Sequence, residues 1–260
     1  MVGKALFGLL AAALIFIPLE RFIPQKREQK IFRKGWLTDI FHFLFTRSIA
    51  DVFTFMFVGS LIFFLHWLIS PSFQQAVGAQ HRGLQFLEAF VIANIGGYLG
   101  HRLSHQIPFL WQFHKIHHSI AEMDWLAAAR VHPLDQIVTK ALIIAPLYVM
   151  GFSKATFGAY LGVAIFQAVL IHANVKINFG PLRWLITTPQ FHHWHHSNVP
   201  EAFNKNFAGE LPLLDMLFGT YYLPKDRMPT SYGLSEQVPA GYLKQLVYPF
   251  KRRHLATDVN

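Results

Sequence analysis

The sequence contains no cysteine, and this absence excludes three kinds of structure at once. Disulfide bonds, cysteine-ligated zinc sites and iron–sulfur clusters all need thiols. Charged residues are also scarce, at 14% of the 260 residues, whereas hydrophobic residues make up 53% and phenylalanine alone occurs 26 times. Together with a positive mean hydropathy, this balance is unusual for a soluble protein and indicates a membrane protein.

A long polar stripe of basic residues, which would indicate a nucleic-acid-binding surface, is missing as well. The formal net charge is +9, but the basic residues stand mainly beside apolar segments, so we expect a membrane partner and no nucleic acid. The run KREQKIFRKGW, from Lys26 to Trp36, directly follows the first apolar segment. Under the positive-inside rule it predicts a cytoplasmic loop beside anionic lipid headgroups.

The apolar segments predict an integral membrane protein that crosses the bilayer several times. The first, Ala5 to Pro18, resembles a signal peptide but has no A-x-A-like cleavage site, so we expect a retained membrane segment. Others run from about Ile49 to Ile69 and from about Leu84 to Leu99. The stretch from Gln136 to Val175, divided at Met150 to Lys154, has the length of a two-helix hairpin. With the basic loop in the cytoplasm, these crossings put every histidine cluster at the cytoplasmic face.

Histidines are concentrated in three short boxes that follow these segments. The boxes are HRLSH at 101–105, HKIHH at 114–118 and HHWHH at 192–196. Within each box the histidines are spaced i, i+4 or i, i+3, i+4, which on a helix places the rings on one face in a metal-chelating geometry. The histidines with this spacing are His101, His105, His114, His117, His118, His192, His195 and His196.

A purely structural role for these rings is disfavoured because few carboxylates lie near them in the sequence. Buried polar groups without partners cost about 1 to 3 kcal/mol each, and metal ligation would remove that cost. Eight rings exceed the needs of one ion, so we expect two metal ions with open positions. The remaining isolated histidines, His42, His66, His81 and His254, are expected to be hydrogen-bonded core or interface residues.

The type of metal follows from what else the sequence lacks. The H-E-x-x-H motif of zinc proteases is absent. The 13-residue separations between the first and second boxes, from His101 to His114 and from His105 to His118, could suit a pair of haems. Pro108 interrupts the helix that this arrangement needs, and the third box would have no role. A nitrogen-lined site beside a membrane suits an apolar substrate that offers mainly C–H bonds, which favours a redox metal such as iron over zinc.

The ordered motifs from His101 to Leu223 resemble the fatty acid hydroxylase superfamily, also called the sterol desaturase family. They include HRLSH, HKIHHS, RVHPLD at 130–135, IHANV at 171–175, TPQFHHWHHS at 188–197 and NFAGELPLLDMLFGTYYLP at 206–224. By this resemblance the metal ligands are the eight box histidines together with His172. The resemblance leaves His132 as a histidine that orients a ligand or binds metal, and His193 as one that supports a ligand, faces a phosphate or binds metal. It leaves Asn174 as a residue that could hold a ring or a water.

The same resemblance implies an all-α integral membrane protein with about four transmembrane helices and a cytosolic, histidine-rich helical cap over a di-iron site. The implied reaction is O₂-dependent hydroxylation or desaturation of a lipid, with electrons from a separate cytochrome or a ferredoxin and reductase. We expect N-terminal membrane segments and the basic loop in residues 1–80, the catalytic domain in 81–224 and a cytosolic tail in 225–260. A membrane metal transporter and a zinc-dependent membrane hydrolase remain as alternatives. Sterols, carotenoids, fatty acyl chains, sphingoid bases and ether lipids are all open as substrates.

Overall fold

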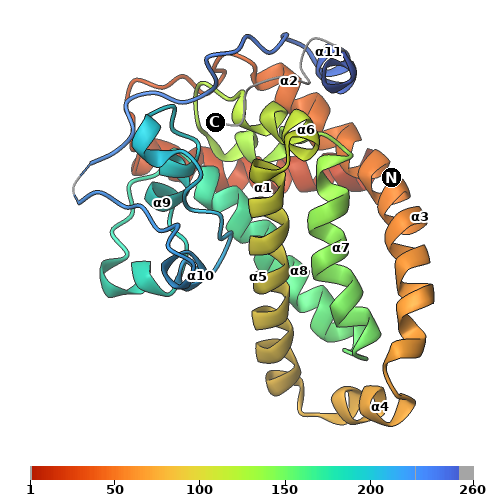
Figure 1. Cartoon of the computed structure of the whole chain (residues 1–260). Helices are drawn as coiled ribbons and strands as arrows, with labels where there is room; N and C mark the ends of the chain where they lie inside the picture. Colours follow the sequence, from red (N-terminus) through yellow and green to blue (C-terminus); the bar gives the residue numbers. More distant parts are fainter. Residues whose placement is uncertain (1, 226, 252–260) are drawn as a thin grey trace.

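The protein is built from helices, as the computed structural model of residues 2–225 and 227–251 shows (Figure 1). Within these residues the β-structure is limited to two isolated bridges, so the all-α prediction is confirmed. The long helices are α1 (Val2–Phe22), α3 (Arg47–Leu65), α5 (Arg82–Gln106), α7 (Asp135–Val149) and α8 (Lys154–His172). The short ones are α2 (Trp36–Phe41), α4 (Pro71–Ala79), α6 (Pro108–His118), α9 (Pro189–His195), α10 (Leu213–Leu217) and α11 (Tyr242–Val247). A π-helical turn, η1 (His42–Thr46), and 3₁₀ turns including η3 (Trp125–Ala129) and η4 (Gly180–Trp184) connect them.

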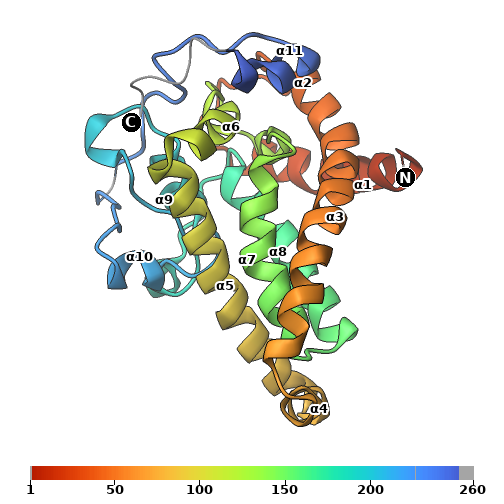
Figure 2. The same cartoon turned by 45° about the vertical axis from the view of Figure 1, so that its right-hand side comes forward.

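Helices α3, α5 and α7 run side by side, and α8 crosses behind them (Figures 1 and 2). At one end of this bundle lies α4, and at the other lie α2, α6 and α11. The backbones of α5 and α7 approach closely at two glycines. A Cβ atom on Gly96 would lie 2.2 Å from the Leu142 oxygen, and one on Gly100 would lie 2.8 Å from Thr139 Cα. Glycine at these positions therefore permits the packing, as in other membrane helix pairs.

Three helical stretches are long and apolar enough to cross a membrane, namely Gly3–Phe22, Trp36–Leu68 and Lys154–His172. They bear out the prediction of a membrane protein, although their number is smaller than the expected four or so. Helix α7 has only 15 residues, and α5 is long enough but carries polar residues such as Glu88 and Asn94. The stretch expected to form a hairpin of two crossings does form two helices, α7 and α8, joined by the turn after Val149, but of the two only α8 is long and apolar enough to cross.

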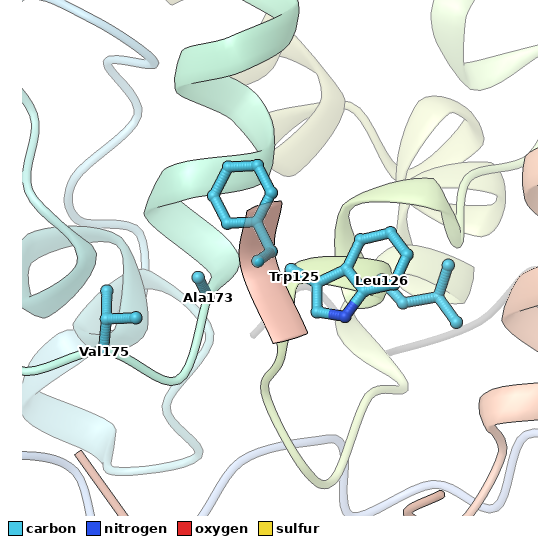
Figure 3. Packing of buried hydrophobic residues seen from close by; sticks show 5 residues of the cluster. Trp125, Leu126, Ala173 and Val175 are labelled. Atoms are coloured by element: carbon cyan, nitrogen blue, oxygen red, sulfur yellow. The ribbon is translucent and has the colours of Figure 1, made fainter. Parts of the chain in front are cut away.

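Helix α1 does not run with the bundle. It lies crosswise at the end where α2 and α6 gather, and it keeps this direction in both views (Figures 1 and 2). Phe16 of α1 is 2% exposed and packs in one cluster with Trp125, Leu126, Ala173 and Val175. Figure 3 shows the last four side chains around the end of α8 and η3. This core fixes α1 against the segment that follows His172.

A buried network of charges joins the basic loop to η3 and to the segment after it. Arg33 donates to Asp39 at 2.7 Å and to Asp124 at 2.6 Å, and Arg130 donates to both oxygens of Asp39. Asp39 itself is fully buried. The loop after α1 is therefore tied down by ion pairs on its inner side, while Arg27, Lys30 and Lys34 point outward.

The isolated histidines differ in burial. His42 is a hydrogen-bonded core residue as expected, with ring contacts to Thr46, the Val131 carbonyl and Gln245. His66 contacts Gln74, and His81 accepts the amide hydrogen of Gly83. Both of these rings are hydrogen-bonded but belong to exposed residues. His254 lies outside the described residues, as does the end of the expected 225–260 tail.

Candidate metal centre

The nine predicted histidines converge at the end of the bundle, from four helices. His101 and His105 lie in the last turns of α5, the second box lies on α6, His172 ends α8, and the third box lies on α9 and at its C-terminus. They form two groups in the described part of the chain. In each group, one ring nitrogen of every member lies within 4.8 Å of the others. The five-histidine group is His101, His105, His114, His118 and His195, and the four-histidine group is His117, His172, His192 and His196.

Local sequence signals produce this convergence. Helix α5 ends at Gln106, Ile107 is extended, and Pro108 occupies the first turn of α6. The chain therefore reverses, and the second box folds back onto the first. Helix α9 begins in the same way at Pro189, with the Thr188 hydroxyl accepting the amide hydrogen of Phe191 at 3.2 Å. Each of these short helices therefore carries its histidines toward its C-terminal end.

Neighbouring residues in the boxes serve different groups. His117 and His118 are adjacent in the sequence, yet the first belongs to the four-histidine group and the second to the five-histidine group. His195 and His196 divide in the same way. The groups touch, since the His118 and His196 rings stack with their centroids 4.5 Å apart. Two ions held by these groups would lie side by side.

The spacing of the inner nitrogens in the four-histidine group is that of ligands around one ion. The Nε2 atom of His172 lies 3.1 Å from that of His117 and 3.0 Å from that of His192. His196 Nε2 lies 3.1 Å from His192 Nε2. An ion bonded to imidazoles at about 2.1 Å holds its ligands about 3.0 Å apart at right angles and about 3.4 Å apart in a tetrahedron. The spacing thus suits nitrogens that share one ion.

Backbone carbonyls fix the outer nitrogen of four of the rings. A carbonyl oxygen can only accept, so each Nδ1 must carry the hydrogen and each Nε2 must present its lone pair to the centre. The pairs are His101 with Phe207, His117 with Arg130, His172 with Ala168 and His195 with Lys205, at 2.7, 3.0, 2.6 and 2.8 Å. These bonds set both tautomer and ring direction before any ion binds.

Burial favours the neutral form of several of these rings. All of the nine are buried except His101, which is partly buried. Burial, reinforced by neighbouring histidines, holds the pKa well below its ordinary value for His117, His118, His192, His195 and His196. Among the described residues, no hydrogen-bond partner exists for His118 Nε2, His195 Nε2 or either nitrogen of His105. Orphaned lone pairs of this kind are costly, and a metal ion would satisfy them, so the donor set fits the expected metal.

His132, His193 and Asn174 lie outside both groups. His132 contacts the Leu246 carbonyl and accepts the amide hydrogen of Leu134. His193 contacts the Tyr232 hydroxyl at 3.1 Å and the His172 carbonyl at 3.2 Å. Asn174 bonds the backbone of Lys26 with both ends of its amide, so it holds the loop after α1 and not a ring. Of the three, only His193 hydrogen-bonds to a member of either group within the described part of the chain, through the backbone carbonyl of His172.

Asp135 is a site residue that the sequence reasoning missed. Both of its carboxylate oxygens lie 3.1 Å from His114 Nδ1. The only signal was its place in the RVHPLD motif, because nothing in the spacing linked position 135 to position 114. A carboxylate in this position orients the ring and makes the ligand nitrogen more basic.

Replacing Asp135 with asparagine is expected to weaken metal binding by the five-histidine group about 10- to 100-fold, because the ring loses its charged acceptor. Competition with a chelator, followed by metal analysis of the purified protein, measures this change. Asp51→Asn is the matched control, since the Asp51 side chain is 57% exposed and pairs with Lys140 and not with a histidine of either group. Equal retention of metal by both variants would contradict the assigned role of Asp135.

Comparison with known proteins places this arrangement in a family. The fatty acid hydroxylase family model matches residues 86–220, just over half of the chain. The chain is 37% identical over 169 residues to the ornithine lipid hydroxylase OlsE of Rhizobium tropici, covering 65% of this chain and 51% of that protein. It is 30% identical over 150 residues to the alkylglycerol monooxygenase of Homo sapiens, covering 58% and 33%. The enzyme of the same name from Danio rerio is 29% identical over 150 residues, again covering 58% and 33%.

The matches therefore span between a third and about half of the length of these relatives. No solved structure matches the chain significantly. The matched region contains all three histidine boxes and His172. The chain belongs to the fatty acid hydroxylase family.

Proposed function

We propose that this chain is an O₂-dependent di-iron enzyme that hydroxylates or desaturates an aliphatic carbon of a membrane lipid. The observation that carries the proposal is the pair of touching, all-histidine groups at the end of an apolar helix bundle. The names of the relatives support a lipid substrate, since one is an ornithine lipid hydroxylase and others are alkylglycerol monooxygenases. Ornithine lipids and alkyl ether glycerolipids are accordingly the first substrates to test.

Two iron ions, one per histidine group, would supply the activation of O₂ that removal of a hydrogen from an unactivated C–H bond requires. The residues of the chain hold the two groups in contact and shield them from water. Trp111 packs against His105 and His118, with ring centroids 5.1 and 5.4 Å apart. Phe207 packs against His105 at 5.2 Å. Both aromatic side chains are buried, so they wall the five-histidine group with apolar surface.

The histidine groups are proposed to face the cytoplasm, where a cytochrome or a ferredoxin and its reductase would deliver electrons. The exposed basic residues of the loop between α1 and α2 support this orientation under the positive-inside rule. The alternatives are less well supported. Transport sites lie near the bilayer midplane, whereas these groups lie at the end of α5 and on the helices that follow it. A zinc hydrolase is less well supported because the sequence lacks the H-E-x-x-H motif.

Lipid profiling of cells grown under ¹⁸O₂, with and without the chain, tests the proposal. Hydroxylation would give a lipid that carries one ¹⁸O atom, and desaturation would give an unlabelled lipid that has lost two hydrogens. Either product should disappear with His117→Ala and with His195→Ala, because each change removes a member of a different group. A product that forms without O₂, or that persists equally in both variants, would refute the proposed reaction.

A further inference from the structure

The direction of α1 conflicts with its composition. Its residues Gly3–Phe22 are long and apolar enough to cross a bilayer, but the helix lies crosswise to α3, α5 and α7 at the end of the bundle that carries the histidines (Figures 1 and 2). The second stretch able to cross, Trp36–Leu68, contains α3, so the bundle direction defines the membrane normal. A helix held across that direction cannot traverse the same layer.

The contacts of α1 show that this placement is built into the fold. Phe16 stacks on Trp125 with ring centroids 6.5 Å apart. The Glu20 carboxylate accepts the amide hydrogens of Trp125 at 2.7 Å and Asn174 at 2.8 Å. After the helix, the Lys176 amide donates to the Ile23 carbonyl at 2.8 Å. The C-terminal half of α1 is therefore fastened to η3 and to the segment just after His172.

The opposite face of α1 is apolar and largely exposed. Phe7 is 75% exposed and Leu14 is 78% exposed, and Leu10 between them is 56% exposed. These three positions follow helical spacing and form one stripe. Charged side chains occur only near the ends, at Lys4 and at Glu20–Arg21. The buried face of α1 also packs against α8, because Phe16 contacts Phe166, which is 52% exposed on that apolar helix.

We propose that α1 is an in-plane helix, whose stripe of Phe7, Leu10 and Leu14 lies in the acyl chains of the leaflet on the histidine side. Lipid is the occupant because α1 is apolar over a length that could cross a bilayer and because basic residues stand near both of its ends, where they reach the headgroups. Lys4 is then on the same side of the membrane as the basic loop. Since α1 is fastened beside His172, the four-histidine group lies close to the depth of the acyl chains, within reach of a lipid that stays in the leaflet.

The absence of cysteine allows a direct test by single cysteine substitutions in the full-length chain in sealed, oriented membrane vesicles. Lys4→Cys and Lys30→Cys report the two ends of the α1 region, and Ser72→Cys reports α4 at the far end of the bundle. All three side chains are exposed. A membrane-impermeant maleimide is expected to label Lys4→Cys from the same side as Lys30→Cys and from the side opposite to Ser72→Cys. Labelling of Lys4→Cys from the Ser72→Cys side would show that α1 crosses the bilayer and would overturn the proposal.

A second pair of variants tests what covers the stripe. Phe7→Cys and Leu14→Cys are expected to react with the impermeant maleimide at least about tenfold more slowly than Lys30→Cys in membranes, and as fast as Lys30→Cys in denaturant, because lipid excludes the reagent. Fast labelling in membranes would place the stripe in water. Oxidative cross-linking of Leu14→Cys into dimers would show that a second copy covers it. Either result would overturn the proposal, and none of these readouts depends on enzyme activity.

Discussion

Replacing His117 with alanine is expected to lower the bound iron from two ions per chain to about one and to reduce lipid oxidation at least about 100-fold. His117 supplies one of the four nitrogens of its group and belongs to no other. Its Nε2 atom lies 3.1 Å from that of His172, so its loss opens one edge of the site. His195→Ala is expected to have the same effect on the other group. Elemental analysis of the purified protein and product formation measure the two quantities.

Combining the two substitutions separates binding from chemistry. Iron content is expected to fall additively, from about two ions to one in each single variant and to none in the double variant. Activity is expected to be lost almost completely in each single variant, with little further loss in the double, because the proposed reaction needs both ions. If iron stays at two ions in either single variant, or if the protein holds zinc in both groups, the assignment is wrong.

His193→Gln and His132→Gln are the matched controls for these variants. Both histidines are buried in the same part of the chain, and neither belongs to a group. Their contacts are with the Tyr232 hydroxyl and the His172 carbonyl for His193, and with the Leu246 carbonyl for His132. Both variants are expected to keep two irons, which would show that the loss in His117→Ala is specific to the group.

Box spacing was enough to predict that the eight box histidines gather, because helical periodicity places i, i+3 and i+4 on one face wherever the helix packs. His172 lies outside the boxes and was predicted only by the family resemblance. Spacing could not divide the nine histidines between two groups. That division depends on how α6 and α9 are rotated against each other, and it separates the sequence neighbours His117 and His118. Asp135 was missed for a related reason, since its contact with His114 joins residues 21 apart through tertiary packing.

The membrane segments show a similar limit. Hydropathy identified the apolar stretches, including the one that forms α7 and α8, because it depends only on consecutive residues in the sequence. It could not give the direction of α1, which is fixed by Phe16 and Glu20 contacts with residues more than 100 positions away. Pro108 was informative in two ways. In the sequence it argued against a long haem-binding helix, and in the structure it begins α6, which folds the second box back onto the first.

Replacing Asp39 with alanine is expected to lower the free energy of unfolding by about 3 to 5 kcal/mol, the usual effect of removing one partner from a buried ion network. Asp39 is fully buried and accepts from Arg33 and from Arg130. Its loss leaves Arg130 without a charged partner among the described residues and leaves Arg33 with Asp124 alone. Thermal unfolding in detergent measures the change, and Asp51→Ala, at an exposed carboxylate, should leave the midpoint almost unchanged.

A second substitution at Asp39 tests whether the network supports the metal centre. The backbone carbonyl of Arg130 accepts from His117 Nδ1 at 3.0 Å, so movement of Arg130 would turn a ring of the four-histidine group. Asp39→Asn, which keeps the shape but removes the charge, is therefore expected to release iron from the four-histidine group before the five-histidine group when a chelator is added. Two kinetic phases of iron release, of which only the faster one responds to Asp39→Asn, would establish this coupling. A single unchanged phase would show that the buried charges support the fold without orienting His117.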